Sequence, residues 1–342
     1  MTSARRSRHA RDLLGDSILT VLDLGARGES PQPWKVLEGV ATFVLFDPDE
    51  AACDALTQAP RARRDPDRYL VLPVAVAGES GSRTLYVTAT PSGSSLFRPG
   101  TDLTDQYVVP GYIDPVREVS VEVLSLSDAL DKLGLGDVHL AKLDIQGVEL
   151  EVLKGLDARR RGGLLAVEVE TPLDHYYEGE PTFPDLHAFM RDEGFELFNV
   201  NPTRVHRRSG SPTRGLDRFA GPAGSSSMAA RLWEFDALYF RKRATIVAEG
   251  SPAQLLRYAT TLCVYRYFAE AFLAVTDDAA RAVLTDSVAD RAGDTIVAWH
   301  RSAMRPWERS TFLHLAHKVI GRAHVGGLRR WSQYEWRSYP HA

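Results

Sequence analysis

An acid and two glycines end the first apolar run of the sequence, where a strand would pass into a loop. The segment VLDLGARGE carries Asp23, Gly25 and Gly28 at this transition. Small residues let the backbone approach a ligand closely, and the N–H groups of the following turn can face a carboxylate. The segment lacks the GxGxxG pattern of dinucleotide enzymes. It therefore predicts a ligand site of another kind at the end of the first strand.

A second acid ends the next apolar run, in the segment VLFDPDE. Asp47 is the candidate there, because an acid at this point can accept hydrogen bonds from both ribose hydroxyls of a nucleoside. Asp49 is the expected N-cap of the following helix. Together the two segments predict a nucleoside site, and the glycine-rich one suits the amino-acid end of S-adenosylmethionine.

A third acid lies in KLDIQGVEL, where an apolar run stops at Asp144, turns through Gly147 and resumes as a helix at Glu149. Asp before a turn and glycine within it also have purely structural uses. The next run, LLAVEVE, ends with Glu168 and Glu170 on one face of a strand.

Apolar runs that alternate with longer amphipathic segments predict strands joined by helical crossovers. The expected strands are 17–25, 42–49, 69–78, 84–89, 139–145 and 164–170, followed by 195–201 and 234–242 as an antiparallel pair. Nearly continuous apolar runs are typical of strands buried on both faces. The fold class is therefore α/β, with a doubly wound, mostly parallel sheet and an antiparallel final strand. Ligands of such sheets bind beyond the carboxyl ends of the strands, where the acids described above lie.

The domain organisation changes near residue 246, after which strand alternation stops. We expect a basic N-terminal tail at 1–16, the α/β domain at 17–245 and an α-helical C-terminal extension at 246–342, whose apolar faces could form a homo-oligomer. The Arg-rich segment 204–218 could meet an anionic acceptor or lie as a solvated loop.

The composition excludes several function classes. The net charge of -4 gives no general attraction to nucleic acid, and no apolar stretch is long enough for a confident membrane span. Cys53 and Cys263 lack the neighbours of a zinc site or a disulfide framework. We expect a cytoplasmic protein, with no nucleic-acid partner and no stable membrane insertion.

The order and spacing of these segments resemble the FkbM-type family of S-adenosylmethionine-dependent methyltransferases. The similar segments are VLDLGARGE, LFDPDE, PVAVAGESGSRTLYV, SGSSL, VEVLSLSDAL, LAKLDIQGVELEVLKGL and LLAVEVE, and they span about 20–242. The resemblance implies a class I methyltransferase (Rossmann-like) fold with S-adenosylmethionine as cofactor. It also implies O-methylation of a sugar, polyketide or other small natural product. The Arg- and Ala-rich composition suggests a bacterial source.

The resemblance implies roles for single residues. Asp23, Gly25, Gly28, Asp47 and Asp144 would bind the cofactor. Adenine contacts would come from about 74–78, including Ala75, through backbone groups and apolar packing.

For catalysis, Asp144 would lie beside the sulfonium, with Glu170 or His175 as the base for the acceptor hydroxyl. A carboxylate site for Mg²⁺ at Asp144, Glu168 and Glu170 is an alternative. Many family members carry Glu where this chain has Gln146, which removes one carboxylate from such a metal site.

Two other functions stay open. One is a methyltransferase-fold scaffold or binding protein that assembles through its helical extension, since a fold does not dictate a function. The other is a protein methyltransferase. The sequence favours a small hydroxylated acceptor in natural product or glycan biosynthesis.

Overall fold

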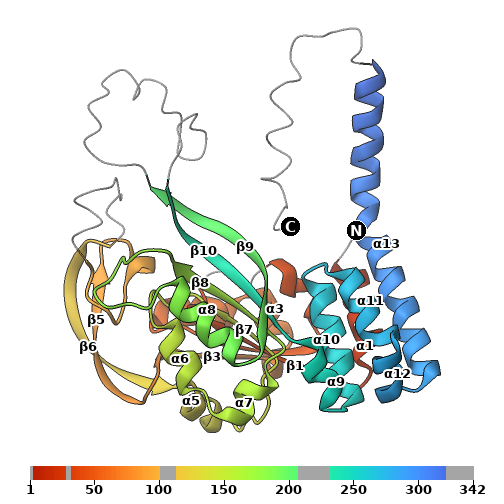
Figure 1. Ribbon diagram of the computed structural model, residues 1–342. Coiled ribbons are helices and arrows are strands. Elements are labelled where there is room, and N and C mark those ends of the chain that lie inside the picture. The colour runs from red at the N-terminus through yellow and green to blue at the C-terminus, as the bar shows by residue number, and fades with distance from the viewer. Residues whose placement is uncertain (1–2, 28–31, 101–112, 207–230, 321–342) are drawn as a thin grey trace. The chain divides into compact units, whose positions relative to one another are not determined.

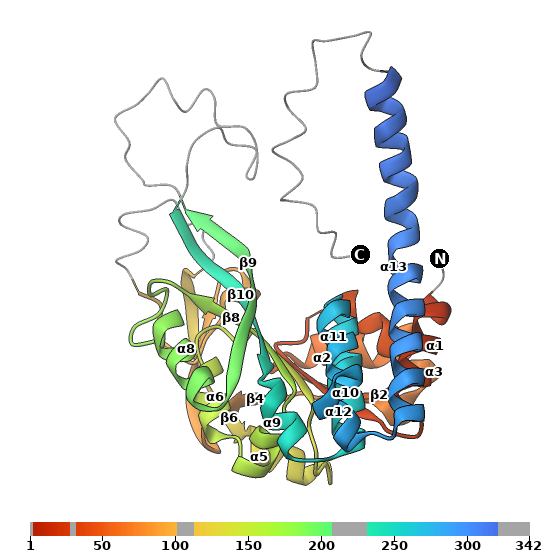
Figure 2. The same ribbon diagram turned by 45° about the vertical axis from the view of Figure 1, so that its right-hand side comes forward.

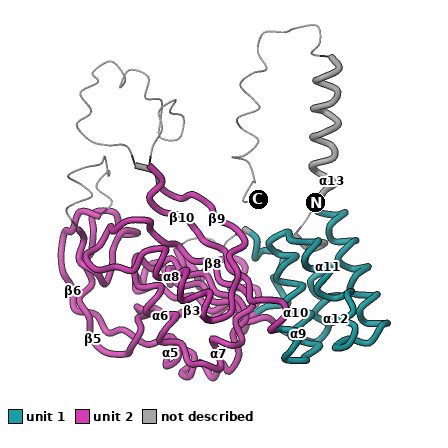
Figure 3. The backbone as a smooth tube through the Cα atoms, in the orientation of Figure 1, with its two compact units in different colours: residues 1–18, 30–41, 246–342 teal, residues 19–29, 42–245 magenta. Residues whose placement is uncertain are grey.

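The computed structural model describes residues 3–27, 32–100, 113–206 and 231–320, and it describes side chains within 7–27, 33–100, 113–204 and 231–303. The chain divides into two compact units (Figure 3). One is an α/β unit made of residues 19–29 and 42–245, and the other is a helical unit made of 1–18, 30–41 and 246–342. The residues expected as a separate N-terminal tail thus belong to the helical unit.

The α/β unit is built on a seven-stranded sheet with the order β3-β2-β1-β7-β8-β10-β9 (Figure 1). Its strands are β1 (Leu19–Leu24), β2 (Ala41–Phe46), β3 (Tyr69–Leu72), β7 (Leu140–Leu143), β8 (Ala166–Pro172), β9 (Phe195–His206) and β10 (Arg231–Arg241). The pairs β2–β3, β1–β7 and β7–β8 are parallel, whereas β10 is antiparallel to both β8 and β9. The predicted doubly wound, mostly parallel sheet with an antiparallel final strand is confirmed.

A second, three-stranded sheet has the order β4-β6-β5. Its strands are β4 (Ala75–Ala77), β5 (Gly81–Thr88) and β6 (Pro115–Ser125). The prediction of one strand at 69–78 is wrong, because β3 ends at Leu72 and β4 belongs to the second sheet. Pro73 lies at the break and cannot donate a ladder hydrogen bond.

The crossover segments of the α/β unit are short helices. They are α2 (Glu50–Gln58), α3 (Pro60–Arg64), η2 (Pro66–Arg68), η3 (Pro91–Gly93), α5 (Leu126–Lys132), α6 (Glu149–Gly155), α7 (Ala158–Gly163) and α8 (Phe183–Asp192). Asp49 is the N-cap of α2, as predicted, because its side chain accepts hydrogen bonds from the N–H groups of Ala51 and Ala52.

The core of the α/β unit lies between the large sheet and helices α5, α6 and α8, which Figures 1 and 2 show beside the strands. Leu22, Leu143 and Val169 contribute the sheet side of this core and are almost fully buried. Their neighbours along each strand, Asp23 and Glu168 among them, point to the opposite face because side chains alternate along a strand. One face of the strands is therefore apolar, and the other face carries charged groups near the strand ends.

The helical unit contains α1 (Ser3–Leu14), η1 (Gln32–Leu37), α10 (Pro252–Val264), α11 (Phe268–Thr276), α12 (Asp278–Val283) and α13 (Asp286–Ile320), and α9 (Arg243–Ala248) begins at the end of the α/β unit. Within this unit the ring of His9 stacks on Trp299, and Trp34 donates a hydrogen bond to the Tyr265 hydroxyl at 3.1 Å. Segments 3–14 and 252–303 thus form one helical core. Among the described residues, no helix has the length and the apolar character needed to cross a membrane.

Candidate functional site

Asp23 lies near the end of β1 with its side chain buried. It pairs in parallel register with Lys142 of β7. Burial raises the pKa of Asp23 to about 6, against the lowering effect of the Lys142 ammonium. Within the described part of the chain, no group donates a hydrogen bond to this carboxylate. A buried carboxylate without donors fits a ligand that brings its own, such as an ammonium group.

Gly25 allows the end of β1 to pass directly against the turn after β7. Its φ is 83°, and a Cβ at this position would lie 1.9 Å from the backbone oxygen of Asp144. The N–H groups of Gly25 and Ala26 both donate to the Phe46 oxygen at the end of β2. Only glycine satisfies this conformation and this approach together.

Asp47 follows β2 directly, and its side chain is only 2% exposed. Arg27 Nε donates to Oδ2 at 3.0 Å, and the Asp49 N–H donates to Oδ1 at 2.8 Å. Burial raises the pKa of Asp47, while the hydrogen bond from Asp49 and the charge of Arg27 oppose that rise. Asp47 is thus an acceptor of two donors at the carboxyl end of β2, next to the loop that follows Gly25.

The turn after β7 is held by the first residue of α6. Glu149 Oε1 accepts a hydrogen bond from the Ile145 N–H at 2.8 Å, and Oε2 accepts one from the Gly147 N–H at 2.9 Å. Gln146 and Gly147 both have positive φ, 58° and 102°. Burial raises the pKa of Glu149 to about 7. The glutamate therefore closes the turn as well as beginning the helix, the role expected from the sequence.

Asp144 and Glu170 form a carboxyl pair at the ends of β7 and β8. They hydrogen-bond to each other, with the proton on Glu170. Burial and then the charge of Asp144 raise the pKa of Glu170 well above its usual value. Burial would raise the pKa of Asp144 too, but Lys142, whose Nζ lies 2.9 Å from Oδ2, brings that pKa below its usual value. Glu170 is therefore the donor of the pair and Asp144 the acceptor.

Gln146 lies between the two carboxyl groups. Its Nε2 donates to Asp144 Oδ1 at 3.0 Å and to Glu170 Oε2 at 2.9 Å. The single hydroxyl hydrogen of Tyr177 is shared between Gln146 Oε1, at 3.2 Å, and the Gly93 oxygen, at 2.8 Å. The amide is thus oriented at both ends.

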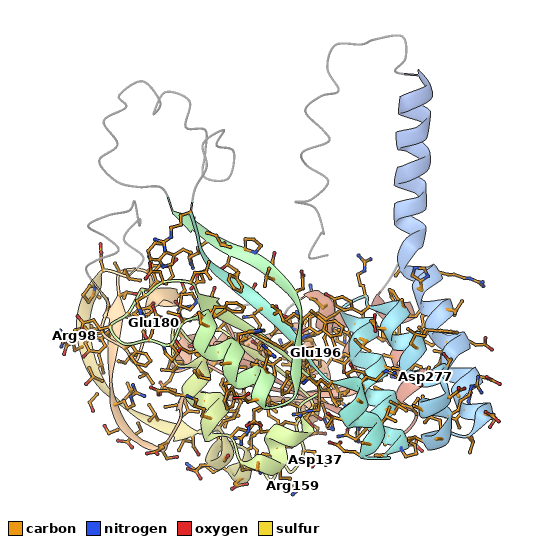
Figure 4. All side chains as sticks on the ribbon, viewed as in Figure 1. Arg98, Asp137, Arg159, Glu180, Glu196 and Asp277 are labelled. Atoms are coloured by element: carbon orange, nitrogen blue, oxygen red, sulfur yellow. The ribbon has the colours of Figure 1, made fainter. Side chains whose placement is uncertain are left out.

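The loop after β8 brings the carboxyl group of Glu180 to the site. Glu180, labelled in Figure 4, accepts hydrogen bonds from the N–H groups of Tyr176 and Tyr177, the latter at 2.9 Å. Burial raises the pKa of Glu180 to about 8. A Cβ on Gly147 would lie 3.0 Å from Glu180 Oε2, so the two strand-end loops pack against each other here.

The carboxylates considered for Mg²⁺ are not arranged as a metal site. Among the described residues, no group of three or more His, Cys, Asp or Glu could hold a metal ion. Lys142 pairs with Asp144, and the Gln146 amide lies between Asp144 and Glu170. Glu168 is opposite Lys142 in the β7–β8 register. Donors already occupy the positions that a cation would need.

Three predicted residues remain. His175 is exposed, in the loop between β8 and α8. Ala75 is buried in β4 among the apolar residues of the second sheet. Gly28 lies outside the described residues.

Three residues that contact the candidate site residues are not singled out by the sequence. They are Lys142, which contacts Asp144, Tyr177, which contacts Gln146, and Arg27, which contacts Asp47. Lys142 could have been found by alternation, because it lies two residues before Asp144 on the same face of the strand. Tyr177 lies 31 residues from Gln146 in the chain, and no spacing signals their contact. Arg27 follows the glycine turn, but nothing in the sequence indicates its pairing with Asp47.

A family model matches part of the chain. The sequence model described as "Methyltransferase FkbM domain" matches residues 32–197, a segment that contains Asp47, Asp144 and Glu170 but not Asp23 or Gly25. The chain is 35% identical over 88 residues to "Methyltransferase sdnD" of Sordaria araneosa. That match covers 23% of this chain and 32% of the relative, so it spans about a third of the relative's length.

Solved structures are more distant. A TehB-like SAM-dependent methyltransferase from Corynebacterium glutamicum has 12% identity and a TM-score of 0.27, with 69% of this chain and 87% of that chain covered. A likeness at this level carries no argument about function.

Proposed function

We propose that the protein, whose residues 32–197 match the FkbM methyltransferase domain model, transfers a methyl group from S-adenosylmethionine to a hydroxyl of a sugar or secondary metabolite. The observation that carries this proposal is the buried Asp23 carboxylate, which lacks a hydrogen-bond donor among the described residues and lies beside Gly25. Such a group suits the methionine ammonium of the cofactor. The family match and the strand order support the same class of enzyme.

The proposed cofactor residues follow from the strand ends. Asp23 and the turn at Gly25 would hold the amino-acid end, and Asp47 would accept hydrogen bonds from the ribose hydroxyls. Arg27 now donates to Asp47, so it would share or yield that carboxylate. Ala75 would contribute apolar packing for the adenine. We do not extend the proposal to a metal ion.

The proposed chemistry needs an activated methyl group and a base. The cofactor supplies the methyl group on a sulfonium. Asp144 carries the negative charge of the carboxyl pair, because Lys142 favours its ionised form. It can therefore accept the proton that an acceptor hydroxyl releases as its oxygen bonds the methyl group, and Glu170 donates a hydrogen bond to Asp144. His175 is less suited to this role because it is exposed and interacts with Asp185.

Calorimetric titration with S-adenosylmethionine tests the cofactor site. We expect binding to the wild type and a loss of about 10- to 100-fold in affinity for Asp23→Ala and Asp47→Ala, as for the loss of a charge-assisted hydrogen bond. Asp137→Ala is a matched control, because Asp137 is exposed and pairs with Arg159 at 2.9 Å on the surface (Figure 4).

Methyl transfer is then measured as S-adenosylhomocysteine formed with sugars and other hydroxylated acceptors. The proposal predicts turnover with at least one acceptor and its loss in Asp144→Asn. If the folded wild-type protein does not bind the cofactor, the enzyme proposal fails and a binding or scaffold function takes its place.

A further inference from the structure

Gln146 has an unusual backbone for its residue type. Its φ of 58° lies in the left-handed region, which is unfavourable for residues other than glycine. Left-handed residues of this kind persist where the surroundings determine them, and they cluster at functional sites. Here the Ser95 hydroxyl donates to the Gln146 backbone oxygen at 2.5 Å, and Glu149 accepts from the N–H groups on either side of the residue. The turn therefore fixes the direction in which this side chain leaves the backbone.

The amide is fixed in one orientation by its partners. Nε2 has two hydrogens, and each can serve one carboxyl group, at 3.0 Å for Asp144 and 2.9 Å for Glu170. The opposite orientation would place the amide oxygen against two carboxyl groups and its NH₂ against the Tyr177 hydroxyl. The carboxyl pair thus selects this orientation, in which the Tyr177 hydroxyl lies at the amide oxygen.

An amide at this position can hold two neighbouring carboxyl groups together, as a bound cation could. It offers a hydrogen bond to each of two neighbouring carboxyl groups and adds no charge. A glutamate there would add a third carboxylate between them, and like charges at such a distance raise one another's pKa.

We propose that Gln146 is a positioning residue that holds the carboxyl groups of Asp144 and Glu170 together as a pair, without a metal ion. The importance of this positioning for catalysis rests on the proposed function, in which the pair is the base for the acceptor hydroxyl. The geometry of the pair itself does not depend on that function.

Several charged groups surround the pair and enter any titration of it. The groups that act on the pair are Lys142 of β7, Asp23 of β1, Glu149 of α6, and Glu234 and Asp236 of β10. Glu168 of β8 acts on Asp23 and Lys142, and Arg204 of β9 pairs with Glu234. Their contribution is the same in variants that change only the amide. A shift in the titration of the pair can therefore be assigned to the amide.

The test is a ¹³C NMR titration of the protein labelled at the glutamate carboxyl carbons, with the Glu170 signal assigned by its absence in Glu170→Gln. Gln146→Leu keeps the approximate size of the side chain and removes both donors. We expect the titration of Glu170 to move upward by about 1 pH unit or more, because hydrogen bonds to the ionised form lower a pKa. Gln58→Leu, at the exposed end of α2, makes the same chemical change elsewhere and should leave the signal unchanged.

Tyr177→Phe is the second variant, in case Gln146→Leu does not fold. It removes the hydroxyl that orients the amide and should produce a smaller upward shift. Addition of Mn²⁺ to the wild type should not broaden the Glu170 signal. Unchanged titration in the folded Gln146 or Tyr177 variants, or specific Mn²⁺ broadening at Glu170, would overturn the proposal.

The two proposals fail separately in these experiments. The NMR titration is made without cofactor, so it reports on the amide even if the protein does not bind S-adenosylmethionine. Calorimetry on the same samples reports on the cofactor site. Loss of cofactor binding in the wild type would overturn the enzyme proposal and leave the role of Gln146 in the carboxyl pair intact.

Discussion

Replacement of Gly25 by alanine should damage both the stability of the α/β unit and the cofactor site. A Cβ at this position would lie 1.9 Å from the Asp144 oxygen, and the φ of 83° disfavours any residue with a side chain. The left-handed conformation costs about 1–2 kcal/mol, and relief of the overlap adds roughly 1–3 kcal/mol as in overpacked cores. We therefore expect the free energy of unfolding to fall by about 2–5 kcal/mol.

Gly134→Ala separates the two contributions. Gly134 has a φ of 66°, but no atom lies within 4 Å of its Cβ position, so this variant carries only the conformational cost. Both variants also restrict the unfolded chain equally, which cancels in the comparison. Thermal unfolding should place Gly25→Ala below Gly134→Ala by roughly 2–12 °C, at about 2–4 °C for each kcal/mol.

The same two proteins are then titrated with S-adenosylmethionine. Gly134→Ala should bind like the wild type, whereas Gly25→Ala should bind at least about tenfold more weakly, because the turns of β1 and β7 must move apart. Equal melting temperatures and equal affinities would refute the reasoning from the close approach of these two turns.

Three further perturbations test the buried groups. The pKa of Asp23 is about 6 in the fold against a usual 3.8, so its stabilising contribution is complete below about 3.8 and is lost as pH rises through 6. Denaturant titrations should show a weaker pH dependence over this range in Asp23→Asn than in the wild type, and what remains comes from groups such as Asp236 and Glu234. Glu149→Gln leaves one of two backbone N–H groups without its acceptor and should lower the free energy of unfolding by about 1–3 kcal/mol, measured in urea at pH 8. Gly155→Ala should lower the melting temperature by several degrees, because its Cβ would lie 2.1 Å from the Gly78 oxygen.

The sheet could be predicted from the sequence because each of its central strands is a nearly continuous apolar run. The acids at 23, 47, 144 and 170 could be placed for the same reason, since the ends of such runs mark the carboxyl edge of a parallel sheet. The strand order confirms this placement. The break at Pro73 was missed because 69–78 is apolar throughout, and hydrophobicity does not show which sheet a strand joins.

The contacts within the site could not be predicted, because they depend on loops that approach each other only in the fold. Gln146 looked like the loss of a carboxylate, whereas its amide joins Asp144, Glu170 and Tyr177. The position of Tyr177 follows from the loop after β8, which Glu180 holds through two backbone N–H groups. The sequence pattern specifies neither of these features.

The charges at the strand ends explain why this edge of the sheet suits a cationic ligand. Asp23, Asp144, Glu168 and Asp236 act on one another electrostatically, and Lys142 supplies the opposing positive charge. Burial of several carboxylates is unfavourable unless protons or a ligand neutralise their charge. Neutralisation by protons is the first route, and the raised pKa values of Asp23 and Asp236, each about 6, reflect it. A ligand with a positive charge offers the second route, because it stabilises the ionised carboxylates that burial alone disfavours. The carboxylates that weaken the fold near neutral pH are therefore those that would bind a sulfonium and an ammonium. The Gln146 amide is neutral, so it orders the carboxyl pair without competing with such a cationic ligand.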